Sequence, residues 1–337
     1  MFGIGSNGAK KHLFSIKLQL YYSTAPPDSH ANVLVDFPVN LLGFSSKDAI
    51  STSGKIKTLV SSSPDLLLRR VDNDLKPKIK VLQEFGLSGS DLVTLVKKTN
   101  FLKRGLHTTI KPNLDYLWDL LGSLDSVVRI VKKEPRLLTN NLLKLIPPNL
   151  SLLQNLGFPW ADVEMAFHRH PRYLLNKPEQ IERAVHQLER NFHVPRESRM
   201  FLHGIEALAS VFDESIVEKK LDIFQSFGWS DSDICEMVRR HPYCLNSSEA
   251  KIRSTLKFFM MELGYESSYL AFRPTLLVSS LEKRVMPRNE ILKFLKENQL
   301  VTEKLSLYTV VMCSESKFLE NYVLPFRPRC PKCMNYT

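Results

Sequence analysis

The sequence predicts an all-α fold of stacked helical repeats, each about 35 residues long, and two recurring residues carry this prediction. Glycine recurs where a first helix would end, at steps of 36, 35, 71 and 36 residues, in Gly86, Gly122, Gly157, Gly228 and Gly264. The step of 71 equals two repeats, with one glycine missing near Phe192. A fixed period in this range is typical of solenoid proteins, in which each helix pair buries its apolar face only against its neighbours.

Proline is the second recurring residue and marks the end of each second helix, because it disfavours the helical conformation of the residue before it. We call this position the proline slot. Asn100 and Glu206 occupy the two slots from which proline is missing. The last step is only 32 residues, which predicts a shorter second helix in that repeat. The slot prolines are Pro64, Pro135, Pro171, Pro242 and Pro274.

Residues 146–175 show one repeat in full. A first helix is expected from Pro148, with Leu150, Leu152, Leu153 and Leu156 at three- and four-residue spacings. The second helix is expected from Pro159, with Val163, Ala166 and Phe167 facing inward. Other repeats also place a proline near the start of the first helix, where a missing N–H costs little. These prolines are Pro77, Pro112 and Pro178. Ser230 and Asp233 predict a reciprocal cap at the start of another second helix.

Composition limits the function classes. The formal net charge is +11, which favours an acidic partner such as nucleic acid or an anionic membrane surface. No apolar run approaches the roughly 20 residues that a membrane span needs, so no membrane partner is expected. The five cysteines are few, odd in number and late in the chain, so they indicate no disulfide framework.

The chain divides into four predicted segments. Residues 1–30 are basic, amphipathic and free of acidic residues before Asp28, as in an organelle transit peptide for the mitochondrion or, as the alternative, the chloroplast. Residues 31–63 read as a degraded first repeat that is only partly ordered. Residues 64–300 form the regular array, and residues 301–337 form a C-terminal cap and tail, since terminal repeats are atypical.

Several motifs resemble those of one known family. The chain repeats Pro-x-Leu-Leu at 64–67, 135–138 and 274–277, and it contains Phe-Gly-Trp-Ser at 227–230 and Arg-Arg-His-Pro at 239–242. A further match is Ser-Leu-Glu-Lys-Arg-Val-Met-Pro-Arg at 280–288. Together these resemble the mitochondrial transcription termination factor (mTERF) family in its plant organellar form. The resemblance implies a curved left-handed superhelix with a basic concave groove. It also implies a role in organellar gene expression, as transcription termination or regulation, or as RNA processing such as intron splicing.

Basic residues recur at fixed distances before the proline slot. A cation stands two residues before it in four repeats, and a cation or histidine stands three before it in five. A stripe of cations along a solenoid suits the line of charge of a phosphate backbone. We therefore predict a site for double-stranded DNA or RNA, which also includes arginines in the adjoining turns and in the late basic stretch. Its residues are Lys97, Lys98, Lys132, Lys133, Arg136, Arg169, Arg172, Arg239, Arg240, Arg273, Lys283, Arg284 and Arg288.

The alternative is that these cations are solvated and merely complement the helix dipole. The chain would then be a protein-binding scaffold of the same architecture, without direct nucleic-acid contact. Other organellar gene-expression proteins are expected partners in either case. The chain is expected to act as a monomer, and the choice between DNA and RNA stays open.

No catalytic or metal-binding constellation stands out. His168 and His170 have no third ligand nearby, and Cys330 and Cys333 are half of a four-ligand zinc site, with only Cys313 close in sequence. There is no glycine-rich phosphate loop and no Ser-His-Asp or paired-carboxylate spacing. We therefore expect no enzymatic activity, no cofactor and no metal.

Overall fold

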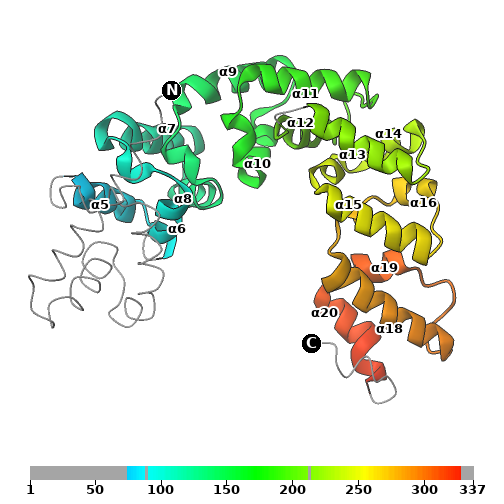
Figure 1. The fold of residues 1–337 in the computed structure, drawn as a ribbon. Coiled ribbons are helices and arrows are strands. Elements are labelled where there is room, and N and C mark those ends of the chain that lie inside the picture. Colours follow the sequence, from blue (N-terminus) through cyan, green and yellow to red (C-terminus); the bar gives the residue numbers. More distant parts are fainter. Residues whose placement is uncertain (1–73, 88–89, 212–213, 328–337) are drawn as a thin grey trace, which may run out of the picture. The chain divides into compact units, whose positions relative to one another are not determined.

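A computed structural model of the chain describes residues 74–87, 90–211 and 214–327, and every regular element in these ranges is a helix (Figure 1). The predicted all-α repeat solenoid is thus confirmed. The chain forms two compact units, which meet in sequence between Leu175 and Asn176, and each is described by itself. The predicted transit peptide, the degraded repeat, Pro64 and the Cys330/Cys333 pair lie outside the described residues. The left-handed superhelix of the whole array stays a prediction.

The described part of unit 1 contains three repeats. In each, a long first helix and a long second helix are followed by a short 3-10 helix, and a wide π-type turn (η5) precedes one first helix. The elements are α5 (Lys76–Glu84), α6 (Ser90–Lys98), η4 (Phe101–Lys103), η5 (Leu106–Ile110), α7 (Lys111–Leu121), α8 (Leu124–Lys133), η6 (Pro135–Leu138), α9 (Leu142–Asn155), α10 (Trp160–Arg169) and η7 (Pro171–Leu175).

Unit 2 continues the pattern through four repeats, and the residues predicted as the C-terminal cap contain further helices up to Phe326. Its elements are α11 (Pro178–Arg190), α12 (Phe201–Ala209), α13 (Glu214–Ser226), α14 (Asp231–Arg240), η8 (Pro242–Asn246), α15 (Glu249–Leu256), η9 (Lys257–Glu262), α16 (Ser267–Phe272), α17 (Thr275–Val278), η10 (Leu281–Val285), α18 (Met286–Glu297), α19 (Leu307–Met312), α20 (Glu315–Phe318), η11 (Leu319–Val323) and η12 (Leu324–Phe326).

Within the described residues, each first helix ends at a residue with left-handed backbone conformation, and these residues recur regularly. All five predicted glycines have positive φ, between 61° and 89°. The place of the missing glycine is taken by His193, with φ of 50°, and Gln299, with φ of 54°, closes the first helix of the last repeat, which has no glycine there. The seven positions follow one another at steps of 36, 35, 36, 35, 36 and 35 residues. Glycine adopts this conformation at little cost, whereas His and Gln are strained there and need support from the fold.

The prolines of the first helices lie later in their helices than the sequence indicated. Pro178 begins α11 as predicted, but α9 starts at Leu142 and contains Pro148. The first helix of the preceding repeat opens with η5, which begins six residues ahead of Pro112. In that turn the N–H of Ile110 donates to the carbonyl five residues back. Such a widened turn relieves the clash of a proline ring with the preceding turn.

The predicted inward face of α10 is confirmed, and that of α9 is confirmed in part. Leu153 of α9 and Val163, Ala166 and Phe167 of α10 are buried. The neighbouring leucines of α9 are only partly buried, so its inner face is narrower than predicted. Ser230 and Asp233 form the predicted reciprocal cap of α14. The shorter second helix is α16, with 6 residues against 10 in α14.

A buried side-chain donor in the first helix of a repeat binds a backbone carbonyl of the short 3-10 helix that follows the second helix. This contact recurs with the period of the repeat. The Asn149 amide donates to the carbonyl of Leu174 at 2.9 Å, and the Lys220 ammonium donates to that of Leu245 at 2.6 Å. These acceptors lie near the ends of short helices, where carbonyls lack partners of their own. The same contact is made by Lys78 to Leu102 and Asn113 to Leu137.

The repeat that lost both glycine and proline packs differently. Ala184 takes the donor position in α11. Gly204 lets α12 pack closely against α11, because a Cβ at this position would lie 2.5 Å from a methyl carbon of Leu188 in α11. The carbonyl at the end of α12 is instead bound by the amide of Asn176, at 2.5 Å. In this repeat the buried donor therefore comes from Asn176, just before α11, and close packing at Gly204 replaces the donor inside the first helix.

Candidate nucleic-acid interface

The four cations that stand two residues before the proline slot share one structural position. Lys98, Lys133, Arg169 and Arg240 are the final residues of α6, α8, α10 and α14, and all four are exposed. A helix carries partial negative charge at its C-terminal end, so a cation is stable there. The same position in α16 is occupied by Phe272.

Contacts within each unit show that neighbouring slot positions lie close together. In unit 1 the Lys133 ammonium donates to the carbonyl of His168 at 2.7 Å, in the last turn of α10 and next to Arg169. In unit 2 the guanidinium of Arg240 lies 3.4 Å from the ring centroid of Phe272. Each unit therefore presents the ends of adjacent second helices as one local surface. Lys97 belongs to α6, but its side chain lies outside the described part of the chain.

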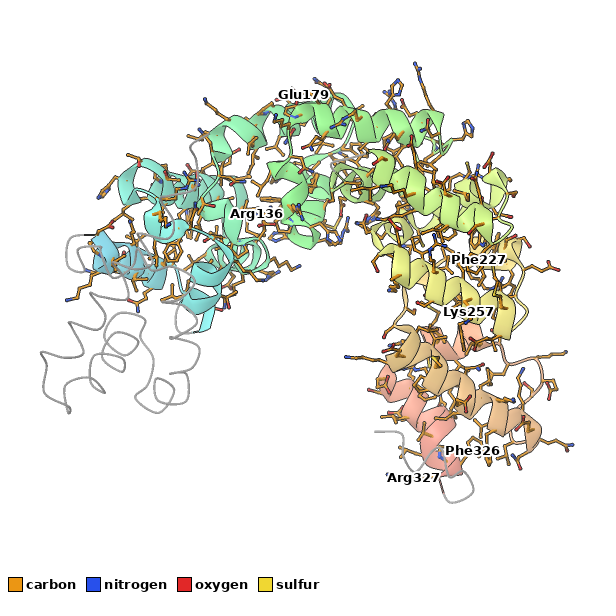
Figure 2. All side chains as sticks on the ribbon, in the orientation of Figure 1. Arg136, Glu179, Phe227, Lys257, Phe326 and Arg327 are labelled. Carbon is orange, nitrogen blue, oxygen red and sulfur yellow. The ribbon has the colours of Figure 1, made fainter. Side chains whose placement is uncertain are left out.

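Acidic side chains reduce the charge of this surface. Arg136, labelled in Figure 2, donates to both carboxylate oxygens of Glu134, at 2.7 and 2.6 Å. Burial alone would raise the pKa of Glu134, but these bonds and the nearby Arg172 hold it below its usual value. Glu134 is therefore ionised at neutral pH. Lys132 pairs in turn with Asp91 at 2.9 Å.

In unit 2 one carboxylate serves two arginines. Glu236 pairs with Arg239 at 2.9 Å and with Arg240 at 2.5 Å, on successive turns of α14. The three side chains together carry one net positive charge. Arg273, just after α16, lies over the ring of Tyr269 at 4.2 Å. These predicted cations are thus held in fixed orientations rather than extended freely into water.

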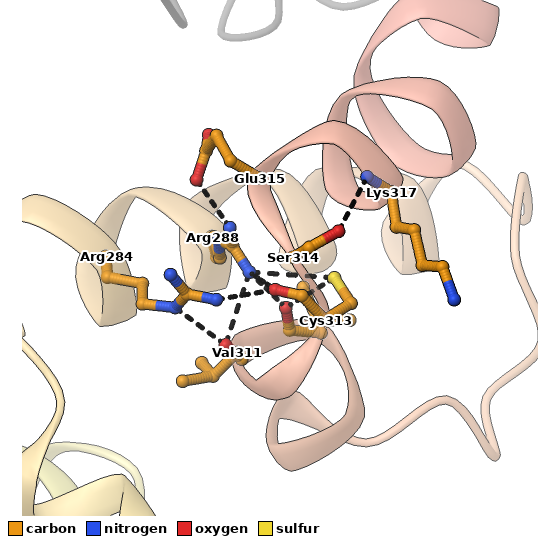
Figure 3. A network of polar contacts seen from close by, with 8 residues as sticks. Arg284, Arg288, Val311, Cys313, Ser314, Glu315 and Lys317 are labelled. Carbon is orange, nitrogen blue, oxygen red and sulfur yellow. Dashed lines mark hydrogen bonds and ion pairs between the residues drawn. The ribbon is translucent and has the colours of Figure 1, made fainter. Parts of the chain in front are cut away.

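The late basic stretch contains one exposed lysine and two arginines that belong to a network of polar contacts, and Figure 3 shows that network. Lys283 is exposed. Arg288 is 0% exposed, and its guanidinium donates to the carbonyls of Val310 and Cys313, both at 2.8 Å. Arg284 is half-buried and also donates to the Cys313 carbonyl, at 2.5 Å. Arg284 and Arg288 hold the C-terminal helices against α18, so we leave both out of the proposed interface.

A buried polar cluster occupies the proline slot of the deviant repeat. Glu206 of α12 is 1% exposed and accepts a hydrogen bond of 2.5 Å from the Tyr243 hydroxyl. His203 lies 3.1 Å from the same hydroxyl, and the ring of His241 meets that of Tyr243 edge to face. Burial lowers the pKa of His241, and His203 lowers it further.

This shift predicts a pH dependence of stability. Since the pKa of His241 is lower in the folded state, the unfolded chain binds the proton more tightly between the two pKa values. The free energy of unfolding of unit 2 should therefore fall as pH drops below about 6.5. We expect His241→Gln to reduce the difference between urea unfolding at about pH 7.5 and about pH 5.5. His186 is exposed, so His186→Gln should leave this difference between the two pH values unchanged. If both variants showed the same difference, the pH dependence would come from a group other than His241.

Two further observations concern the described residues. Within the described ranges no helix is both long and apolar enough to cross a bilayer. In the same ranges no three His, Cys, Asp or Glu side chains gather in a way that would hold a metal ion. The fold and the charged helix ends together define a helical-repeat protein with basic residues at the ends of its second helices.

Comparison with known proteins places the chain within this class. The mTERF family matches residues 96–319, about two thirds of the chain, and the chain belongs to this family. It is 20% identical over 286 residues to Transcription termination factor MTERF15, mitochondrial, of Arabidopsis thaliana, covering 85% of this chain and 63% of that protein. It is 24% identical over 294 residues to Transcription termination factor MTEF18, mitochondrial, of the same plant, covering 81% of this chain and 52% of that protein. The chain thus spans only part of each relative's length.

Proposed function

We propose that this chain is an organellar nucleic-acid-binding protein that regulates gene expression, through transcription termination or through RNA processing such as intron splicing. Family membership supports this function, and both relatives carry names of mitochondrial transcription termination factors. Those names and the basic start of the chain favour the mitochondrion. The protein acts by binding and not by catalysis.

One observation carries the proposal: an exposed cation ends the second helix in four repeats. Lys98, Lys133 and Arg169 belong to unit 1, and Arg240 belongs to unit 2. Within unit 1 the recurring position gives a recurring spacing along the chain, and a phosphate backbone is a line of evenly spaced charge. Such contacts position a protein on nucleic acid without reading its bases. The proposed interface also contains the neighbouring cations Lys97, Lys132, Arg136, Arg172, Arg239, Arg273 and Lys283.

The salt dependence of binding tests this interface. Each phosphate that a cation neutralises contributes about −0.9 to the slope of log affinity against log salt on duplex DNA, and about −0.7 on a single strand. Replacing Lys98, Lys133, Arg169 and Arg240 together with Gln should flatten that slope by up to about three. The helices should stay folded, because Gln, Lys and Arg have similar helix propensities.

A matched control has the same change in net charge. Lys80, Lys144, Lys219 and Lys257 are exposed and lie on the first helices of four repeats, and Lys257 is labelled in Figure 2. Their replacement with Gln should change the slope far less. If the parent and both quadruple variants gave equal slopes, the ends of the second helices would not be the binding surface.

The protein-binding scaffold is the second candidate, and the paired acids favour it. Glu134 neutralises Arg136, and Glu236 is shared by Arg239 and Arg240. If the parent protein shows no salt-dependent affinity for DNA or RNA of any sequence, the scaffold becomes the better account of the same surface.

A further inference from the structure

An aromatic side chain interrupts the series of cations at the ends of the second helices. Phe272 is the final residue of α16, as Arg240 is of α14, and it stands two residues before its proline slot. Its side chain is 54% exposed. The fold does not bury this ring, and the position that it occupies is cationic in four other repeats.

Two arginines lie near this ring, and two tyrosines lie near one of these arginines. The Arg240 guanidinium lies 3.4 Å from the Phe272 ring centroid, and the Arg273 guanidinium lies 5.8 Å from it. Arg273 also lies 4.2 Å from the ring centroid of Tyr269 and 5.5 Å from that of Tyr308, which belongs to α19. We call these five residues the aromatic–arginine cluster. All of them belong to unit 2.

The cluster holds its planar groups in place before any ligand arrives. Glu236 pairs with Arg240 at 2.5 Å and so fixes the guanidinium that covers Phe272. A cation over an aromatic face is attracted by the ring electrons, which further restrains both partners. The exposed part of the Phe272 ring is therefore an ordered flat surface beside positive charge.

We propose that the aromatic–arginine cluster is a stacking site for an unpaired nucleobase, so that unit 2 prefers single-stranded nucleic acid to a duplex. The inference rests on the proposed function, because the flanking cations place a backbone beside the ring. In a duplex the base faces are covered by neighbouring bases, whereas an unpaired base offers its face to an aromatic ring or a guanidinium. Stacking is tolerant of sequence, since every base has a flat face.

The test compares ring variants on two forms of nucleic acid. Phe272→Leu keeps an apolar side chain but removes the ring. Its affinity for a single-stranded oligouridylate should fall about tenfold, while its affinity for a duplex of equal length changes less than about twofold. The salt slope should not change, because the ring carries no charge. Phe272→Trp should keep or strengthen single-strand binding.

Phe227→Leu is the matched control. Phe227 is half-buried and lies just before the start of α14, whereas Arg240 is at the end of that helix (Figure 2). This variant should bind both probes like the parent. Circular dichroism of all three variants checks that the helices are intact.

A second readout follows the base itself. An oligouridylate with one central 2-aminopurine should lose fluorescence when it binds the parent and should lose less with Phe272→Leu. Equal losses, or equal weakening of single-strand and duplex binding, would overturn the stacking site. If the parent binds neither probe, the proposed function fails as well. If the helix-end variant changes the salt slope and Phe272→Leu changes nothing, only the stacking site fails.

Discussion

Arg288→Met should destabilise the C-terminal helices by about 3 kcal/mol or more. The Arg288 guanidinium is fully buried and binds the carbonyls of Val310 and Cys313 and the carboxylate of Glu315. Methionine fills much of the volume but leaves buried carbonyls without donors, and each costs about 1–3 kcal/mol. Because neighbouring repeats stabilise one another, the loss should appear first as faster hydrogen exchange in α19 and α20.

Lys293→Met provides the control on the same helix. Its ammonium is exposed and lies 3.9 Å from Glu297, in a surface ion pair of little energetic weight. This variant should exchange and melt like the parent. Equal protection of α19 and α20 in the parent and in Arg288→Met would show that the buried guanidinium does not hold the C-terminal helices.

Leu153→Asp should be the most destabilising single substitution in unit 1, by more than about 4 kcal/mol. Leu153 is 0% exposed on the inner face of α9. The change leaves a cavity and places a carboxylate in the buried core. The aspartate must then either be protonated at a cost in free energy or disrupt the packing of its repeat.

Leu143→Asp separates burial from helix chemistry. Leu143 lies on the same helix and is 57% exposed. An aspartate in the first turn of a helix is favourable, so this variant should melt near the parent temperature by circular dichroism. Similar melting of the two variants would mean that the inner face of α9 is wrongly assigned.

Much of the fold could be predicted because glycine and proline, which have strong backbone preferences, recur with the period of the repeat. Glycine and proline marked most helix ends directly. His193 and Gln299 could not be found in this way, since neither residue favours the left-handed conformation and only the surrounding fold imposes it. The early start of α9 was hidden because Pro148 suggests a helix start, while buried Leu142 and Ile146 extend the helix before it.

The place of the basic residues at the helix ends could be predicted, but their pairing with acidic side chains could not. The recurrence of basic residues identified the helix ends, but the pairing of Glu236 with two arginines depends on side-chain geometry. The signal was present, since Glu236 stands three and four residues before Arg239 and Arg240 on one helix. Arg288 gave no such signal, because a sequence does not distinguish a buried arginine from an exposed one. Phe272 likewise gave no signal, because a sequence does not show whether an aromatic ring at a helix end is buried or exposed.

The central claim is that nucleic acid lies along the C-terminal ends of the second helices. Ultraviolet crosslinking of the protein to RNA bound in isolated organelles, followed by mass spectrometry of the crosslinked peptides, tests it most directly. Crosslinks should map to peptides that contain the ends of α8, α10 and α14, with Phe272 among the modified residues. Crosslinks confined to the first helices, such as the surface around Lys144 and Lys219, would contradict the claim.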